Sequence, residues 1–350
     1  MEIKRILLPD LLKGLAAVLM VQVHITELFI DNIGRESMWG KTSLFLGGPF
    51  AAMVFMIVMG YFVARNKKSP KENLFRGIKI FALGFLLNVG LNFHLLWKIL
   101  FEDWLYNPWQ YVFGVDILYL AGISIMVLSA LKQLKKGQEW ASISLFLLII
   151  GLSGFMNNIL LVSETNYFLP FLAGNYSWSY FPVFPWLAYP VLGFFLSLEM
   201  ERIKSFFLDQ RIYSFIVVAV TAVSVLFFGE MGINTSINLP DYYHHTYGFA
   251  FWAVGLVFLW AILLFFVSTW FAETKPILFL CWIGKNITVF YVIQWLIIGN
   301  ISTVIYQTKS MDNFVYYFFG IFAVTVMLTF LYEKAKSKLT SNKRTSIQNA

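Results

Sequence analysis

Charged residues are scarce in this sequence. Asp, Glu, Lys and Arg account for 13% of its 350 residues, whereas soluble domains contain about 25%. Hydrophobic residues reach 59%, and the mean hydropathy is +0.70. This balance excludes an ordinary soluble protein and predicts a membrane protein in which many transmembrane helices share one body.

Cysteine is almost absent, with Cys281 as the one thiol. This count excludes an internal disulfide and any metal site built from cysteine ligands. The adjacent His244 and His245 would not share one face of a helix, and no HExxH, Walker, GxSxG or GxGxxG motif occurs. We therefore expect no metal. The first apolar run is too long and too charged for a removable signal peptide.

What the sequence does contain is a series of ten apolar stretches. A transmembrane helix needs roughly 20 residues, and each stretch approaches that length. They predict an all-α, polytopic transmembrane bundle of ten spans within residues 1–333, followed by a basic tail, 334–350, that we expect to be cytoplasmic and disordered. The stretches cover about 7–30, 49–64, 74–96, 111–131, 140–161, 181–199, 211–229, 247–271, 277–299 and 313–332.

The distribution of Lys and Arg predicts an orientation. With the N-terminus inside, the inner segments hold 19 of the 26 basic residues, Lys4 and Arg5 among them, and the outer segments hold four. Basic residues concentrate in cytoplasmic loops, so we expect both termini in the cytoplasm. The net charge of +7 then indicates contact with anionic lipid and not with nucleic acid.

The first span carries an unusual set of polar residues. Asp10, Lys13, His24 and Glu27 fall within an arc of about 100° on one helical face. A charge in hydrocarbon costs at least about 2.5–3.5 kcal/mol, so this face should point at the protein interior or at a wet cavity. The alternative is that Asp10 pairs with Lys13, Glu27 reaches the headgroups, and His24 is an ordinary buried histidine.

His24 is the first candidate for chemistry. It lies 14 residues beyond Asp10, about 21 Å along the helix, and therefore in the outer half of the bilayer. A neutral imidazole can accept a proton from a hydroxyl or an amine. Glu27, one turn further on, or an acid from another span could orient the ring. Asp116, at the start of the fourth span, is expected at the same depth.

Other polar residues could serve either a functional site or the packing of the bundle. Lys13, with Arg76 and Lys79 of the third span, could bind phosphates near the inner side. Asn88, Asn92, His94, Asn286 and Gln294 could line a site or serve as hydrogen-bonding contacts between helices. The outer loops are rich in Trp, Tyr, Asn and acids, which fits either an aromatic belt at the membrane interface or a surface that binds carbohydrate.

Residues 5–24 resemble the opening of acyltransferase family three. That family has a basic residue, a glycine and, eleven positions after the basic residue, a histidine. Here these are Lys13, Gly14 and His24. The family usually has Arg where this sequence has Lys13, and lysine lacks the bidentate geometry of arginine.

Three further segments are similar to the related heparan-α-glucosaminide N-acetyltransferase-like group. They are PFAAMVFMIVMGYFVAR at 49–65, YFPVFPWLAYPVLGFFL at 180–196, and IGKNITVFYVIQWLI at 283–297, which contains a Gly-x-Asn motif. In that group the histidine that carries the acetyl group lies in the first outer loop. Residues 31–48 contain no histidine, so His24 is the one histidine to which a role can be carried over.

The resemblance implies an acyltransferase of the bacterial inner membrane. It would take an acyl group from cytoplasmic acyl-CoA, which we expect to be acetyl-CoA, and pass it to a hydroxyl or amine of a sugar acceptor on the outer side. An oligomer is compatible with this interpretation. Together with the polar residues described above, the resemblance leads us to expect that His24 and Lys13 are catalytic, that Lys13, Arg76 and Lys79 bind CoA, and that substrate is bound by Asp10, Glu27, Asp116, Trp186 and Asn286.

The residues alone leave two other interpretations open. A transporter or flippase of a glycan or a lipid-linked precursor could use the intramembrane charges as a relay. A scaffold or sensor without catalysis would need them for folding alone.

Overall fold

The structure is a computed structural model that describes residues 7–159 and 165–348, and its regular elements in these ranges are all helices. The described residues also contain two isolated β-bridges, Ile30–Lys309 and Val115–Ser179. The all-α class is therefore confirmed. Lys4 and Arg5, which contribute to the charge count, lie outside the described residues, and the orientation stays a prediction.

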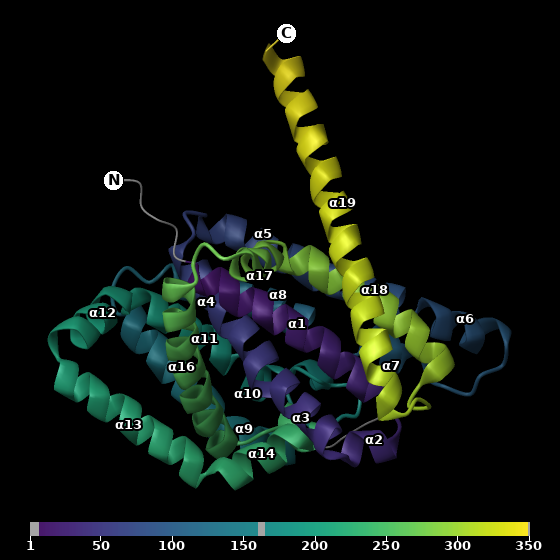
Figure 1. The fold of residues 1–350 in the computed structure, drawn as a ribbon, viewed down its shortest axis with the longest axis horizontal. Helices are drawn as coiled ribbons and strands as arrows, with labels where there is room; N and C mark the ends of the chain where they lie inside the picture. Colours follow the sequence, from purple (N-terminus) through teal and green to yellow (C-terminus); the bar gives the residue numbers. More distant parts are fainter. Residues whose placement is uncertain (1–6, 160–164, 349–350) are drawn as a thin grey trace.

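The N-terminal part supplies the centre of the bundle. Helix α1 (Leu8–Leu28) runs diagonally through the molecule (Figure 1). It contacts helices from both ends of the sequence, including α3, α4, α17, α18 and α19. After α1 come α2 (Asn32–Glu36), α3 (Met38–Gly47), the π-helix η1 (Gly48–Met53) and α4 (Val54–Arg65).

The middle of the chain packs against α4 through α8 and α11. Helix α5 packs along α8, while α11 packs against both α4 and α9. The elements are α5 (Pro70–Leu91), α6 (Phe93–Phe101), α7 (Pro108–Val112), α8 (Ile117–Leu131), α9 (Gln138–Ile159), η2 (Leu169–Phe171), α10 (Val183–Trp186), α11 (Ala188–Leu198) and α12 (Met200–Asp209).

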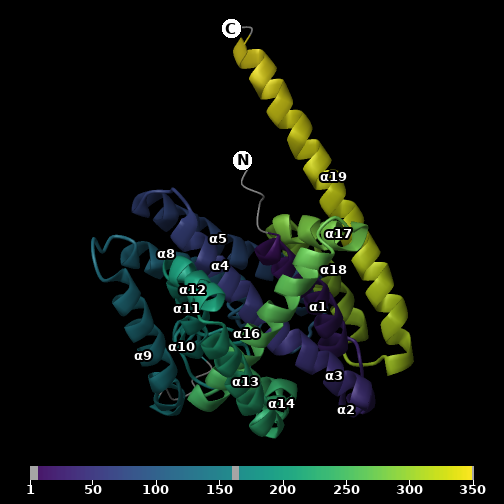
Figure 2. The ribbon, with the colours of Figure 1, turned by 60° about the vertical axis from the view of Figure 1, so that its left-hand side comes forward.

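The C-terminal part adds helices around α1. They are α13 (Arg211–Phe227), α14 (Gly229–Ile237), α15 (Leu239–Tyr243), α16 (Tyr247–Trp270), α17 (Lys275–Lys285), α18 (Ile287–Ile305), η3 (Met311–Asn313) and α19 (Phe314–Gln348). Figure 2 shows α9 and α19 on opposite sides of α1. We call the lower end of the bundle in Figure 1, which carries α2 and α14, the α2 end.

Seven helical segments in the described ranges are long and apolar enough to cross a membrane, and two bent pairs raise the number to nine. The bends are 65° between α11 and α12 and 61° between α13 and α14. The predicted fourth span corresponds to α8, which has 15 residues and is shorter than these. Helix covers most of each predicted stretch within the described residues, although 74–96 is divided at Asn92 between α5 and α6. The chain is therefore an integral membrane protein, with seven to nine candidate spans in the described ranges where the sequence predicts ten.

The predicted ninth span, 277–299, is wrong as a single helix. Helix α17 ends at Lys285 and α18 begins at Ile287, with Asn286 between them at φ −103° and ψ 18°. A carbonyl oxygen of α1 occupies the space beside Gly284, so α17 crosses α1 closely before the chain turns.

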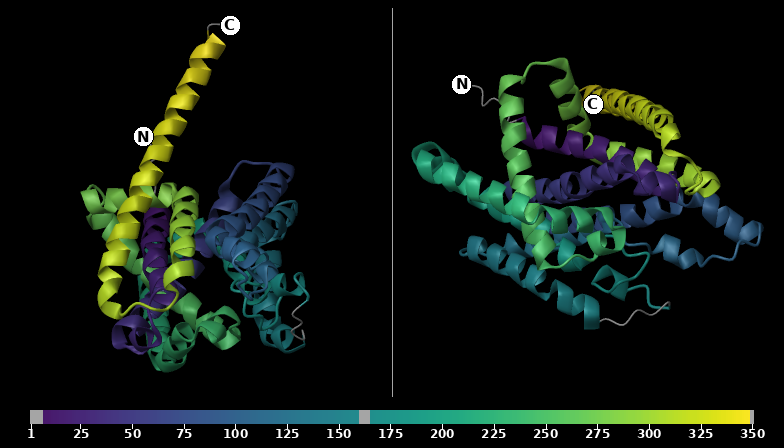
Figure 3. Two further views of the ribbon diagram at one scale, coloured as in Figure 1. Left: turned by 90° about the vertical axis from the view of Figure 1, so that its right-hand side faces the viewer. Right: turned by 60° about the horizontal axis from the view of Figure 1, so that its bottom comes forward.

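The C-terminal helix α19 continues to Gln348, through most of the segment expected to be a disordered tail. It projects beyond the other helices (Figure 3).

Two helix pairs approach closely because glycines face carbonyl oxygens. A Cβ on Gly60 of α4 would lie 1.9 Å from O of Pro190, and one on Gly193 of α11 would lie 1.9 Å from O of Ile57. Gly14 and Gly284 stand in the same reciprocal relation between α1 and α17. Small residues allow such approach in membranes, where packing and not the hydrophobic effect joins helices.

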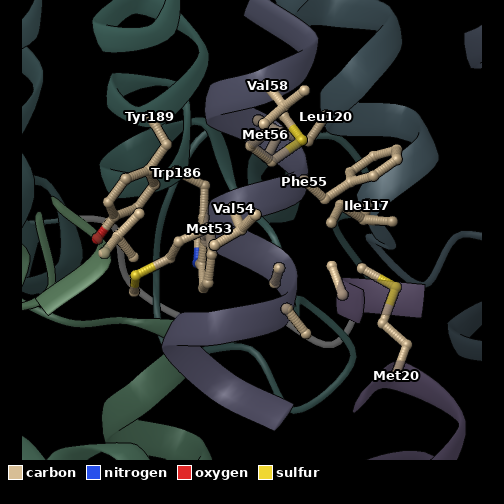
Figure 4. Packing of buried hydrophobic residues seen from close by; sticks show 14 of the residues in the cluster. Met20, Met53, Val54, Phe55, Met56, Val58, Ile117, Leu120, Trp186 and Tyr189 are labelled. Atoms are coloured by element: carbon tan, nitrogen blue, oxygen red, sulfur yellow. The ribbon is translucent and has the colours of Figure 1, made fainter. Parts of the chain in front are cut away.

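The core lies where η1 and α4 pass between α8 and the α10–α11 segment. Figure 4 shows Met53 and Val54 between Trp186 and Tyr189 on one side and Ile117 and Leu120 on the other. These side chains belong to one buried apolar cluster. The segment η1 is π-helical, a form that often occurs at functional sites.

Replacing Gly60 by Ala should destabilise the protein, because α4 and α11 would have to move apart to admit the new Cβ. Overpacking of this kind costs about 1–3 kcal/mol and sometimes more. Thermal unfolding in detergent measures the loss. Gly151→Ala on α9 is the matched control, since its Cβ would meet nothing within 4 Å. Equal melting temperatures for the two variants would contradict the close packing.

Candidate functional site

A cavity of about 40 Å³ lies toward the α2 end of the bundle. A cavity needs about 10–15 Å³ to hold one water, so this one has room for more than one water-sized group. Its wall combines α1, the α3–η1 junction, α15 and α18 with parts of α8, α14 and the loop before α10. The lining residues are Met20, Val23, His24, Glu27, Leu44, Gly47, Gly48, Ala52, Ile117, Phe181, Ser236, Leu239, Tyr242, Tyr243 and Tyr291.

His24 brings an imidazole to this cavity. Its ring packs in a tilted arrangement against Trp295 of α18, with centroids 4.0 Å apart and an interplanar angle of 33°. Its buried Nδ1 has no hydrogen-bond partner among the described residues. The contact with Trp295 therefore positions the ring, and Nδ1 is not engaged by any described residue.

Glu27 lines the cavity one helical turn beyond His24. Its Oε1 accepts a hydrogen bond from the Tyr243 hydroxyl at 3.2 Å, and its backbone carbonyl accepts one from Nε2 of Gln307, also at 3.2 Å. The expectation that Glu27 could orient His24 is not met by a hydrogen bond, because Nδ1 of His24 has none. Glu27 instead presents a carboxylate fixed by a tyrosine.

Asp116 lies behind the cavity wall. It is the N-cap of α8, where Oδ1 accepts from the backbone N–H of Ile117 at 2.7 Å. Its Oδ2 accepts from the hydroxyl of Tyr291, which does line the cavity, at 2.7 Å. Asp116 thus sets the position of Tyr291.

The segment 242–244 is held by three side chains that donate to three successive carbonyls. Nδ1 of His245 donates to O of Tyr242 at 2.7 Å, Nε1 of Trp186 donates to O of Tyr243 at 2.8 Å, and Nδ2 of Asn157 donates to O of His244 at 3.0 Å. Helices α9 and α10, together with the adjacent His245, therefore fix the backbone that presents Tyr242 and Tyr243 to the cavity.

These bonds also define the state of His245. A carbonyl can only accept, so Nδ1 carries the proton, and Nε2 accepts from the Tyr189 hydroxyl at 2.7 Å. Burial lowers the pKa of His245 to about 3, and His244 adds to this effect. His245 is therefore a neutral structural residue.

In the described part of the chain, no three His, Cys, Asp or Glu side chains are placed to hold a metal.

Trp186, expected to bind substrate, lies outside the cavity wall. Its side chain is fully buried and is not part of the cavity wall. Its indole N–H donates a hydrogen bond to the backbone carbonyl of Tyr243. Trp186 therefore positions the segment 242–244 and does not itself reach a ligand in this cavity.

The basic residues expected to bind phosphates at the inner side do not line this cavity, and their role stays a prediction. Nζ of Lys13 is 3.0 Å from Oδ1 of Asp10 and 4.8 Å from the centre of the Phe62 ring. Eleven residues of helix, about 16 Å, separate Lys13 from His24. Arg76 and Lys79 lie in the first half of α5, and none of these residues lines the cavity. The pairing of Asp10 with Lys13, which the sequence offers as the alternative, is what the structure contains.

The asparagines of the third and ninth predicted spans act in local structure. Nδ2 of Asn88 donates to the carbonyls of Val112 and Gly114 at 3.1 and 2.7 Å, which fixes the loop before Asp116. Nδ2 of Asn286 donates to O of Trp282 at 3.2 Å and closes the turn between α17 and α18. Asn286 is therefore not placed to bind a substrate in the cavity.

Sequence reasoning did not identify the tyrosines. Tyr242 and Tyr243 lie in PDYYHHT, within a loop noted for its aromatic residues, and Tyr291 lies in the segment that follows Asn286. Tyrosine is also abundant at membrane interfaces, so their abundance alone could not separate a site from a belt.

Comparison with known protein families gives one finding. A sequence model for the catalytic domain of heparan-alpha-glucosaminide N-acetyltransferase matches residues 5–208. Comparison with curated proteins gives no match. The matched range contains His24, Glu27, Asp116 and Trp186, whereas Tyr242, Tyr243 and Tyr291 lie outside it.

Replacing Trp186 by Phe should destabilise the protein, because the carbonyl of Tyr243 would lose its donor. A buried polar group left without a partner costs about 1–3 kcal/mol, and the smaller ring adds a packing loss. Trp140→Phe is the matched control, since Trp140 is 77% exposed. Thermal unfolding of both purified variants measures the difference, and an unchanged Trp186→Phe protein would show that this bond does not hold the segment 242–244.

Proposed function

Because the chain belongs to the heparan-alpha-glucosaminide N-acetyltransferase catalytic-domain family, we propose that it transfers an acetyl group from acetyl-CoA to an amine or hydroxyl of a sugar at the outer side of the membrane. The observation that carries this proposal is His24. It lies within the matched range, borders the cavity, and has a buried ring nitrogen without a partner among the described residues.

His24 acts as the general base. The acceptor amine or hydroxyl attacks the thioester carbonyl and passes its proton to the imidazole. The tetrahedral intermediate then collapses, the C–S bond breaks, and the thiolate of CoA takes the proton from the imidazolium. The products are the acetylated acceptor and CoA, and the base returns to its neutral form.

The cavity suits the reacting groups and not the whole donor. Its volume of about 40 Å³ is far too small for a nucleotide, so the ADP part of acetyl-CoA has to lie outside it. Arg76 and Lys79 of α5, with Lys13 of α1, are the basic groups that we assign to the phosphates, on the cytoplasmic side. Lys13 is already paired with Asp10, which makes Arg76 and Lys79 the stronger candidates.

The acceptor would enter from the α2 end, which we place on the outer side. Glu27 offers a carboxylate that can accept hydrogen bonds from sugar hydroxyls or an amine. Phe181, Tyr242 and Tyr243 border the same cavity and offer aromatic rings. With this orientation both termini are cytoplasmic, as the basic residues predict.

Replacing His24 by Ala should reduce acetyl transfer by about 10²–10⁴-fold, the usual contribution of a general base. The affinity for CoA should not change, because the phosphates bind elsewhere. The measurement is acetyl-CoA binding and turnover by the purified protein in detergent, with glucosamine as the trial acceptor.

His94→Ala is the control for this experiment, because His94 contacts Asn300 at 3.4 Å and lies outside the cavity wall. It should keep full activity. Full acetyl transfer by the His24→Ala protein would show that His24 is not the base. Failure of the wild-type protein to bind acetyl-CoA would refute the donor.

A further inference from the structure

The three tyrosines that line the cavity differ in what their hydroxyls do. Tyr243 donates to Glu27, and Tyr291 donates to Asp116. The hydroxyl of Tyr242 is buried and has no hydrogen-bond partner among the described residues. A buried hydroxyl without a partner is costly, so Tyr242 is the tyrosine whose donor is left for a bound molecule.

The ring of Tyr242 is held on several sides. It packs edge-on against Trp186 and Phe249, with centroids 5.3 and 6.0 Å away. The carbonyl of the same residue accepts the bond from His245. The residue is 4% exposed. Its hydroxyl is therefore directed by rigid surroundings and does not need to be ordered when a ligand arrives.

Gly48 provides the space for this ring. A Cβ on Gly48 would lie 3.2 Å from Cε2 of Tyr242, which is closer than a relaxed contact. Gly48 is the first residue of the π-helix η1 and lines the same cavity. The irregular helix and the glycine together admit the tyrosine beside the groups of α1.

We propose that the hydroxyl of Tyr242 donates a hydrogen bond to the acyl oxygen of the thioester as negative charge develops on it. The assignment rests on the proposed function, since it needs an acyl group in the cavity beside His24. A fixed donor directed at a developing oxyanion lowers the barrier without reorganisation at the moment of reaction.

The proton count of the step is simple. His24 takes the proton of the acceptor, the carbonyl oxygen becomes an oxyanion, and the phenol O–H of Tyr242 keeps its proton while donating the hydrogen bond. When the C–S bond breaks, the carbonyl re-forms and the bond weakens. Burial, together with the charge of Glu27, raises the pKa of Tyr242 well above its usual range, which keeps the hydroxyl protonated.

Tyr242→Phe tests the assignment because it removes the hydroxyl and keeps the ring. Acetyl transfer should fall by about 10²–10³-fold in kcat, the usual loss for one oxyanion donor. Acetyl-CoA affinity and the melting temperature should stay at wild-type values. Tyr316→Phe is the matched control, since Tyr316 is 80% exposed on α19, and it should keep full activity.

Gly48→Ala is a second test that retains the hydroxyl. The new methyl group has to displace the Tyr242 ring, so kcat should fall while the affinity for acetyl-CoA stays the same. In the double variant, Gly48→Ala should add nothing to the loss caused by Tyr242→Phe, because both changes act on one hydrogen bond.

The outcomes separate this assignment from the proposed function. Wild-type transfer with an unchanged kcat in Tyr242→Phe overturns the assignment and leaves the function standing. Additive losses in the double variant, or a fall in acetyl-CoA affinity with the Phe substitution, also overturn it, because they indicate a structural role. Absence of transfer by the wild-type protein refutes the function and this assignment together.

Discussion

A polar group buried in a membrane must find its partner inside the protein. This constraint separates the buried polar residues of the bundle into those that have a partner and those that do not. Asn88 is occupied by two carbonyls, Asp10 by Lys13, and Asp116 by Tyr291. His24 and Tyr242 border one cavity and keep polar atoms without a partner in the described part of the chain. Unpartnered polar atoms also occur elsewhere, for example in Ser124 and Trp178, but His24 and Tyr242 are the two such residues that line the cavity in the described part of the chain.

The cavity depends on both halves of the chain. Helix α1 and the π-helix η1 lie within the family-matched range, while α15 and α18 lie beyond it and contribute the tyrosines. The segment 242–244 joins the halves, because Asn157 and Trp186, both inside the matched range, donate to its carbonyls. A change in α9 or α10 can thus reach Glu27 through Tyr243 without touching a substrate.

Helix packing explains why the site is rigid enough for this arrangement. Reciprocal glycines bring α4 against α11 and α1 against α17, and these contacts fix η1 and α1 on either side of the cavity. The break at Asn286 follows from the same requirement, since α17 has to cross α1 before α18 can run beside it and place Trp295 against His24.

The sequence by itself determined the membrane class, the all-helical fold, and the face of α1 that carries His24 and Glu27, because composition sets the class and the helical period sets which residues share a face. Only the tertiary structure decided which polar residues meet. Periodicity cannot show that Lys13 is taken by Asp10, that Trp186 and Asn286 serve backbone carbonyls, or that Tyr242, Tyr243 and Tyr291 surround His24. Those relations depend on how helices far apart in the sequence are rotated and displaced against one another, and that is fixed by packing contacts that no single segment contains.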